Sequence, residues 1–409
     1  MKYPRIIGRG LAAQSGGPTA VINSSLVGVI KAALAERDII TDLWGSVNSV
    51  EGILRKDCID LYRQNRRTIE RVMITPGAAL GSSRKKIGKD IKESEILEVF
   101  KKYDIRYFFL IGGNDSADNA KAISELAKNE NYDMRVFHIP KTVDDDLLKN
   151  DHTPGYGSAA LYVARVFMGD NYDNLSLPGV KINVVMGRNA GFLTAASALA
   201  RREGRKDDAP HLIYLPERQF VEKKFLEDLA GVLKENKRAV IAVAEGIENE
   251  NGRLIGWNGK TFDSHGNPEL DALYLARRLT KLVKKSGIST RVRADVLGYP
   301  QRCFAGCVSE QDRKEAKIVG IKAVEAAISG DYESGSIALK RMQDSEGRYS
   351  FYTRVVPLKS VAKNTKKMPS KFINSKTNDV TPAFIRYAKP LVGKLPKFGS
   401  LKYINPIRG

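Results

Sequence analysis

A run of three acidic residues follows a short apolar segment in the first half of the chain. Residues 140–146 read Pro-Lys-Thr-Val-Asp-Asp-Asp, directly after the apolar stretch 136–139. Consecutive carboxylates repel one another, so such a cluster is costly without a counter-cation, which Lys141 and a hard divalent ion would supply. An isolated run of this kind is more often a solvated acidic turn. It therefore becomes informative only in combination with other motifs.

Two glycine turns offer a second kind of chemistry, phosphate binding. Residues 15–19 read Ser-Gly-Gly-Pro-Thr and precede a helical pattern, whereas residues 112–116 read Gly-Gly-Asn-Asp-Ser and follow an apolar run. Glycines let backbone amides approach a phosphate, and a helix N-terminus adds a favourable field. Asp115 can cap the helix or bind a metal. Each turn taken alone is equally compatible with a plain tight turn.

Four arginines stand at or near further turns. Arginines that converge on a cleft suit a phosphorylated sugar, because the guanidinium group grips phosphate oxygens in a bidentate manner. Any one of them alone is more often a surface residue. They are Arg84, Arg188, Arg293 and Arg302.

These motifs stand at the ends of short apolar runs that alternate with amphipathic stretches. Continuous apolar runs are typical of a parallel sheet covered on both faces, and the alternation predicts a doubly wound α/β fold. Such sheets bind ligands beyond the carboxyl ends of their strands, where the polar motifs lie. The expected strands are 107–111, 136–139, 182–185 and 239–244, and the expected helices are 21–36, 94–102, 116–128 and 225–234.

In this order, the glycine turns, the acidic run and the arginines resemble the phosphofructokinase family. The resemblance extends from Gln14 to about Gly393, and agreement of six turns in sequence order is not expected by chance. The matching turns lie at residues 16–19, 112–116, 140–146, 186–188, 244–246 and 297–302.

The resemblance implies two doubly wound, Rossmann-like parallel-sheet domains and a basic C-terminal extension. Residues 1–155 together with about 305–353 would form the phosphate-donor domain. Residues 156–304 would form the sugar-phosphate domain. Residues 354–409 would pack on the surface as the extension.

Within the family, the chain is similar to the pyrophosphate-dependent branch. ATP-using members have glycine at the positions that match Asp115 and Lys141. A carboxylate at Asp115 would repel the α-phosphate of ATP, and Lys141 would place an ammonium group beside the distal phosphate of pyrophosphate. Pro18, Thr19 and Tyr299, which replaces a common histidine, also look like that branch.

The activity that the resemblance implies is in-line transfer of a phosphoryl group from pyrophosphate to the C1 hydroxyl of fructose 6-phosphate. The products would be fructose 1,6-bisphosphate and phosphate, with Mg²⁺ as cofactor. Pyrophosphate and the new ester are closer in energy than ATP and that ester, so we expect a reversible reaction. The alternatives are an ATP-dependent 6-phosphofructokinase, sedoheptulose 7-phosphate as a second acceptor, and a non-catalytic paralogue that binds sugar phosphates.

The resemblance also implies roles for individual residues. Asp144 aligns with the base that takes the C1 hydroxyl proton; neighbouring acids should raise its pKa, whereas Lys141 and Mg²⁺ should lower it. The implied catalytic residues are Lys141, Thr142, Asp144 and Arg188. The implied donor-binding residues are Gly17, Arg84, Asp115 and Lys141. The implied sugar-phosphate residues are Thr142, Asp144, Met186, Gly187, Arg188, Glu245, Arg293, Tyr299 and Arg302. The implied metal ligands are Asn114, which replaces the family's aspartate, Asp115 and Asp146.

The sugar site of this family is normally completed by a neighbouring subunit. The family arginine that reaches across corresponds to Lys181 or is missing here. The resemblance therefore implies a homodimer or a homotetramer.

The net charge is the unusual global property. The 409 residues include 67 Lys and Arg against 47 Asp and Glu, a formal net charge of +20. Residues 354–409 alone hold 13 Lys and Arg and a single acid, Asp379. They lack the interleaved aromatic residues of a nucleic-acid platform, so we interpret the charge as a solvated, oligomer-contacting surface and expect no nucleic-acid partner.

The remaining features indicate a protein of the cytoplasm. Cys58, Cys303 and Cys307 are odd in number and unpaired in spacing, which argues against a disulfide scaffold. No apolar run reaches the roughly 18 residues of a membrane span. We therefore expect no membrane partner.

Overall fold

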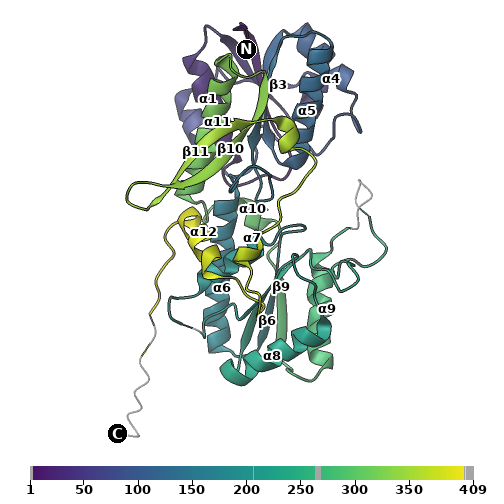
Figure 1. The fold of residues 1–409 in the computed structure, drawn as a ribbon, viewed down its shortest axis with the longest axis vertical. Helices are drawn as coiled ribbons and strands as arrows, with labels where there is room; N and C mark the ends of the chain where they lie inside the picture. Colours follow the sequence, from purple (N-terminus) through teal and green to yellow (C-terminus); the bar gives the residue numbers. More distant parts are fainter. Residues whose placement is uncertain (1–2, 206, 263–268, 400, 402–409) are drawn as a thin grey trace.

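The computed structural model describes residues 3–205, 207–262, 269–399 and 401. Within these residues the chain forms two α/β halves, drawn one above the other in Figure 1. A seven-stranded sheet has the order β11-β10-β5-β4-β1-β2-β3, and a four-stranded sheet has the order β7-β8-β6-β9. This arrangement confirms the expected α/β fold class with two doubly wound sheets.

The larger sheet collects strands from both ends of the described chain. Neighbours pair in parallel from β2 through β1, β4 and β5 to β10, and the antiparallel strands β3 and β11 form its two edges. Its strands are β1 (Gly8–Gln14), β2 (Ile40–Ser46), β3 (Cys58–Asp60), β4 (Ile105–Gly112), β5 (Arg135–Pro140), β10 (Ser334–Gln343) and β11 (Tyr349–Val356).

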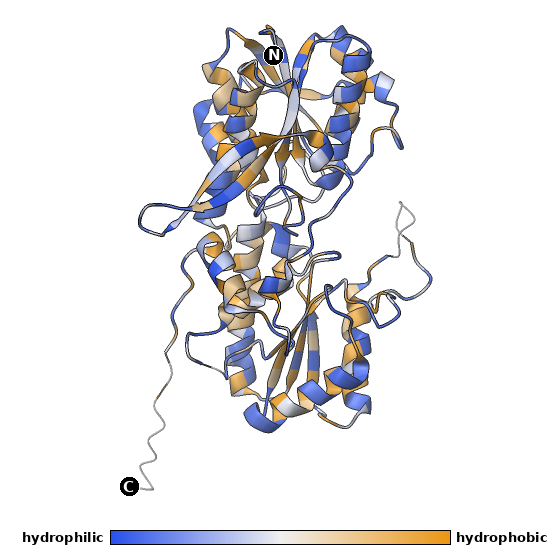
Figure 2. Ribbon diagram, in the orientation of Figure 1, coloured by the Kyte–Doolittle hydropathy of each residue, from blue (hydrophilic) through white to orange (hydrophobic). Residues whose placement is uncertain are grey.

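Helices cover both faces of this sheet. One face packs on α1 (Ile22–Ala35) and α11 (Glu310–Ile328), and the other packs on α4 (Glu93–Lys102) and α5 (Asn114–Asn129). Shorter helices, α2 (Val50–Arg55) and α3 (Arg66–Ile74), lie beside them. Apolar residues of the strands pack against both helix layers, and Figure 2 shows hydrophobic residues along the strands of the upper half.

The smaller sheet is parallel throughout. Its strands are β6 (Val180–Val185), β7 (Leu212–Tyr214), β8 (Ala239–Ala244) and β9 (Val292–Val296). One face packs on α6 (Tyr156–Ser176), α7 (Phe192–Ala195) and the 3-10 turn η1 (Ala196–Ala200), and the other packs on α8 (Glu222–Asn236) and α9 (Ala272–Lys285). A short helix, α10 (Pro300–Cys303), follows β9.

The four strands and four helices expected from the sequence are confirmed. The strands are β4, β5, β6 and β8, and the helices are α1, α4, α5 and α8. All six residues of β8 are buried, in keeping with its continuous apolar sequence, and all six of β5 are buried as well, including Arg135 and His138.

The segment after β11 crosses from the upper half to the lower half (Figure 1). It contains the 3-10 turns η2 (Leu358–Ser360) and η3 (Ser370–Phe372) and the helix α12 (Pro382–Val392). The buried side chains of α12, which belong to the core around α6, are Phe384, Tyr387, Ala388, Leu391 and Val392. This differs from the expected surface packing of residues 354–409, because apolar residues at helical spacing anchor α12. Residues 400 and 402–409 lie outside the described residues.

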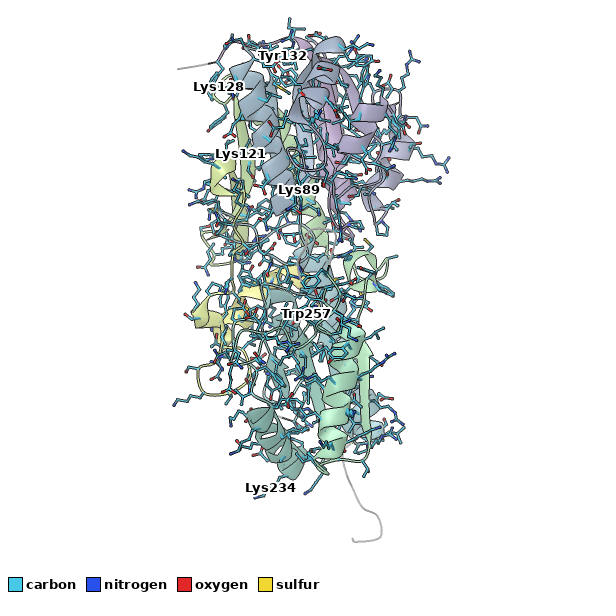
Figure 3. The ribbon with its side chains drawn as sticks, turned by 90° about the vertical axis from the view of Figure 1, so that its right-hand side faces the viewer. Lys89, Lys121, Lys128, Tyr132, Lys234 and Trp257 are labelled. Atoms are coloured by element: carbon cyan, nitrogen blue, oxygen red, sulfur yellow. The ribbon has the colours of Figure 1, made fainter. Side chains whose placement is uncertain are left out.

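Positive side chains decorate the outside of both halves. Figure 3 shows Lys128 at one end of the molecule on α5 and Lys234 at the other end on α8, and both are exposed. Over the residues that the structure describes, no helix is both long and apolar enough to span a membrane. All three cysteines are free.

Candidate active site

The two glycine turns and the acidic run meet at one edge of the larger sheet. β4 and β5 end side by side, with Gly112 paired to Pro140. The Lys141 amide donates to the Gly112 carbonyl oxygen at 2.9 Å, and the Ser15 amide donates to the Ile111 carbonyl oxygen at 2.8 Å. Because these strands are neighbours, their carboxyl ends bring together motifs that are up to about 130 residues apart in the sequence.

Three cationic side chains crowd this edge. The Lys141 ammonium donates to the Gly17 carbonyl oxygen at 2.7 Å, and Lys141 is only 3% exposed. Burial, assisted by the nearby Arg302, lowers the pKa of Lys141 to about 8. Burial and the charge of Arg84 lower the pKa of Arg302 in turn. Cations that repel one another in a partly buried cleft favour the binding of a polyanion between them.

Asp144 faces these cations. Burial raises the pKa of Asp144, whereas Arg302 and Lys141 act to lower it. The Asp144 amide donates to the Thr142 hydroxyl oxygen at 3.1 Å, which fixes the turn between the two residues. A partly buried carboxylate with a raised pKa is suited to accept a proton.

Asn114 and Asp146 form a pair of side chains next to Asp144 whose oxygen atoms could bind a metal ion. The Asn114 amide nitrogen donates to the Asp146 carboxylate at 3.2 Å, and the Asn114 side-chain oxygen is buried without a hydrogen-bond partner. Burial and the charge of Asp144 raise the pKa of Asp146 to about 7. Mg²⁺ commonly uses one or two protein oxygens together with water and substrate phosphates, so this pair fits it. Across the described ranges, no group of three or more His, Cys, Asp or Glu side chains is placed to hold a metal.

Asp115, the third expected metal ligand, has a different partner. Its carboxylate lies 2.7 Å from the Lys86 ammonium, and its side chain is 57% exposed. The pair stands at the first turn of α5, over the glycine turn. The structure therefore leaves Asn114 and Asp146 as the metal candidates and gives Asp115 a lysine partner.

The other wall of the site comes from the smaller sheet. The Met186 amide donates to the Gln301 side-chain oxygen at 3.2 Å, and the Gly187 amide donates to the Glu245 carboxylate at 3.3 Å. Next to these contacts lies a cavity of about 430 Å³. Its lining includes Met186, Glu245, Tyr299 and Gln301, together with residues 258, 261 and 269–273.

Charged groups of this wall interact with Asp144 of the acidic run. Burial, followed by the charge of Asp144, raises the pKa of Glu245 to about 7, and Arg188 and Arg302 oppose that rise. The Arg302 guanidinium lies 4.6 Å from the centroid of the exposed Tyr299 ring. The backbone at Gly246 packs directly against the backbone at Arg188, because a Cβ on Gly246 would lie 1.9 Å from the Arg188 carbonyl oxygen.

Arg293 is the predicted sugar-site residue that the structure places apart. It lies on β9, the edge strand of the smaller sheet, where it pairs with Lys181 of β6. It is exposed and lines a second groove, of about 710 Å³. The other basic side chains of this groove are Arg277, Lys281, Lys284 and Lys285.

Three residues at the site were not predicted. Gln301 belongs to a turn that the sequence singles out, so its position offered a signal. Lys366 and Tyr387 contact Asp145 of the acidic run but come from the C-terminal segment, more than 200 residues further along the chain. The only signal in that segment was its positive charge, which we interpreted as surface.

Comparison with known proteins agrees with this geometry. The family model described as Phosphofructokinase matches residues 10–327. The chain is 46% identical over 392 residues to the pyrophosphate–fructose 6-phosphate 1-phosphotransferase of Rhodospirillum rubrum, with 95% of each chain covered. It is 36% identical to the protein of the same name from Halomonas elongata, over 93% of this chain and 90% of the relative.

A solved structure leads to the same family. The pyrophosphate-dependent phosphofructokinase from Marinobacter aquaeolei superposes with a TM-score of 0.83 at 32% sequence identity, covering 96% of this chain and 94% of that one. Fold, motif order and identity over nearly the full length agree, and the chain belongs to the phosphofructokinase family.

Proposed function

We propose that the protein transfers a phosphoryl group from pyrophosphate to the C1 hydroxyl of fructose 6-phosphate, reversibly. The observation that carries the proposal is the buried ammonium of Lys141 against the Gly17 carbonyl oxygen, with Arg302 and Arg84 beside it. A small polyanion fits this group of cations. The names of the relatives at 46% and 36% identity support the same donor and acceptor.

The choice between pyrophosphate and ATP as phosphate donor follows from the side chains that lie at the start of α5. In ATP-dependent members of the family, glycine at the position of Asp115 leaves room for the α-phosphate. Here the Asp115 carboxylate and the Lys86 ammonium occupy that region as an ion pair. The pair acts mainly by occupying space, since much of the Asp115 charge is compensated.

Acid–base chemistry falls to Asp144. Its carboxylate takes the proton of the C1 hydroxyl while the C1 oxygen forms a bond to phosphorus and the bond from that phosphorus to the departing phosphate breaks. Lys141 and Arg302 stabilise the negative charge on the transferring group, and Arg188 approaches it from the sugar side. In the reverse direction Asp144 returns the proton to the C1 oxygen.

Asn114 and Asp146 are the residues that would hold Mg²⁺. When bound, the ion supplies positive charge to the pyrophosphate oxygens. Thr142, whose hydroxyl accepts from the Asp144 amide, orients the base.

We also propose that the working enzyme is a homo-oligomer in the cytoplasm. Arg293 lies on the edge strand β9 in a basic groove that apolar residues also line, and one of these, Leu273, is 57% exposed. A second copy placed at this edge would bring a phosphate-binding arginine to a neighbouring site. The three free cysteines support a reducing compartment.

A coupled assay tests the donor. The purified protein is incubated with fructose 6-phosphate, Mg²⁺ and either pyrophosphate or ATP, and fructose 1,6-bisphosphate is measured. We expect product with pyrophosphate, and the reverse reaction with fructose 1,6-bisphosphate and phosphate. Turnover with ATP alone contradicts the assignment. Replacing the acceptor with sedoheptulose 7-phosphate measures how much room the 430 Å³ cavity leaves for a longer sugar.

A further inference from the structure

The middle residue of the acidic run points the opposite way from its neighbours. Asp145 is fully buried, and its carboxylate faces the C-terminal segment rather than the cations of the cleft. One oxygen lies 3.3 Å from the Lys366 ammonium and accepts the Thr153 hydroxyl at 3.4 Å. The other accepts the Tyr387 hydroxyl. Asp145 is therefore not available to the substrates.

The backbone conformation at Asp145 explains how adjacent carboxylates of the acidic run point in two directions. Its φ is +58°, in the left-handed region that residues other than glycine rarely adopt. This twist turns Asp145 inward while Asp144 faces Arg302 and Asp146 meets Asn114. Such a conformation persists where surrounding contacts hold it.

The contacts that hold it come from residues 357–392, which we term the C-terminal strap. Thr365 pairs with Leu147 in an antiparallel bridge, and the Lys366 amide donates to the Asp146 carbonyl oxygen at 2.6 Å. The Lys366 ammonium also donates to the carbonyl oxygens of residues 150 and 151, at 3.2 and 3.3 Å. The strap is thus bonded to the backbone of the acidic run as well as to its middle side chain.

Tyr387 on α12 provides the second anchor. Its hydroxyl also lies 3.0 Å from the Asp151 carbonyl oxygen, and its ring packs in the core against Phe372 and Phe384. Because α12 is fixed by the lower half of the molecule, Tyr387 ties the acidic run of the upper half to a rigid element.

We propose that Lys366 and Tyr387 are positioning residues, which act through Asp145 to hold Asp144 and Asp146 in the cleft. Neither touches the reacting groups. The basic strap thereby sets the geometry of the base and of the metal pair from outside both sheets. This inference rests on the proposed function, because it assumes phosphoryl transfer to a sugar phosphate. It does not depend on which phosphate donor the protein uses.

The first test removes each anchor separately. We expect Lys366→Met and Tyr387→Phe to lower kcat by about 10²-fold, the effect of misplacing a catalytic group by roughly 1 Å. The KM for each substrate should change by no more than about threefold, because the groups that bind the substrates remain. The matched controls are Lys389→Met, an exposed lysine of α12, and Tyr352→Phe, an exposed tyrosine of β11. Both should retain wild-type kcat.

The second test asks whether Lys366 acts through Asp145. Lys366→Met alone leaves a buried carboxylate without its cation, whereas adding Asp145→Asn removes that charge. We expect the double variant to have a kcat close to that of Asp145→Asn alone, so that the two effects are not additive. Lys366→Arg, which keeps the charge, should recover part of the loss.

Two outcomes overturn the proposal. One is an unchanged kcat in Tyr387→Phe and Lys366→Met, with a lower Tm as the only effect, which would leave the strap a purely structural role. The other is strict additivity in the double variant. Tyr387→Phe keeps the packed ring, so it remains informative if Lys366→Met does not fold. If the wild-type protein uses only ATP, the proposed donor fails, and the same kcat ratios measured with ATP still test the strap.

Discussion

The two sides of the cleft are built in different ways. On the side of the larger sheet, the ends of the neighbouring interior strands β1, β4 and β5 bring Gly17, Asn114 and the acidic run together within one chain. On the sugar side, Met186 and Glu245 converge in the same manner, but Arg293 sits on the edge strand β9. Interior strand ends assemble a site by themselves, whereas an edge strand presents its residues outward. We therefore expect the proposed donor half to be complete within the chain, and the proposed sugar half to need a residue of a second copy.

The exposure of the side chains also differs between the two sides of the cleft. Lys141 is 3% exposed, whereas Tyr299 is 69% exposed. Fixed charges in a dry site stabilise a transition state more strongly than solvated ones do. Substitutions on the donor side should therefore affect turnover most, and substitutions at the edge should mainly affect sugar binding.

The largest effect is expected at Asp144. Asp144→Asn keeps the shape of the side chain but removes the proton acceptor, and general-base catalysis is worth about 10³-fold. We expect kcat to fall by about that factor while the KM for both substrates stays similar. Steady-state assays with pyrophosphate provide the measurement. Asp133→Asn, at an exposed position between α5 and β5, serves as the control. Substantial residual turnover would assign the base to another residue.

The next largest effect is expected at Lys141. Lys141→Met removes the buried ammonium from the pyrophosphate site, and loss of such a charge lowers kcat/KM by about 10²-fold. The loss should appear with pyrophosphate as the varied substrate, and the KM for fructose 6-phosphate should hardly change. Lys128→Met on the outside of α5 is the control (Figure 3). An equal rise in the KM for pyrophosphate and in the KM for fructose 6-phosphate would mean that Lys141 does not distinguish the two substrates.

The sequence predicted the donor side better than the sugar side, for a physical reason. Strand-end motifs are local: an apolar run followed by Gly, Lys or Asp tells where Lys141 and Asp144 will lie. Arg293 lies at the start of β9 and Arg302 lies beyond its carboxyl end, and the position of β9 at the sheet edge depends on the order of strands. The contacts of Asp145 with Lys366 and Tyr387 depend on packing across more than 200 residues. No local pattern encodes either of these.

A smaller effect is expected at Arg293. If a neighbouring copy uses this arginine, Arg293→Ala should raise the KM for fructose 6-phosphate by about 10-fold, equivalent to one lost charged hydrogen bond. The KM for pyrophosphate should be unchanged. Mixing Arg293→Ala and Asp144→Asn proteins after mild dissociation should then restore part of the activity, because some hybrid sites hold both native residues. Activity that stays at the average of the two separate proteins would place Arg293 outside any shared site.

The smallest effect is expected on the free energy of unfolding in the absence of substrate. It tests whether the charges of Glu245 and Asp144, on opposite walls of the cleft, interact. The pKa of Glu245 is raised from its ordinary value of 4.5 to about 7 by burial and by Asp144 across the cleft. The folded state therefore keeps the Glu245 proton at pH values where the unfolded chain has released it. By linkage, this group makes the folded state less stable as pH rises from about 4.5 to about 7.

Glu245→Gln removes that dependence. Between about pH 5.5 and about pH 7.5, urea unfolding should show wild type losing about 2 kcal/mol relative to the variant. Glu250→Gln, at an exposed position, should track the wild type. Adding Asp144→Asn should reduce the difference, because part of the rise in the Glu245 pKa comes from that charge. If Asp144→Asn leaves the difference unchanged, burial alone raises the Glu245 pKa and the two sides of the cleft are electrostatically independent.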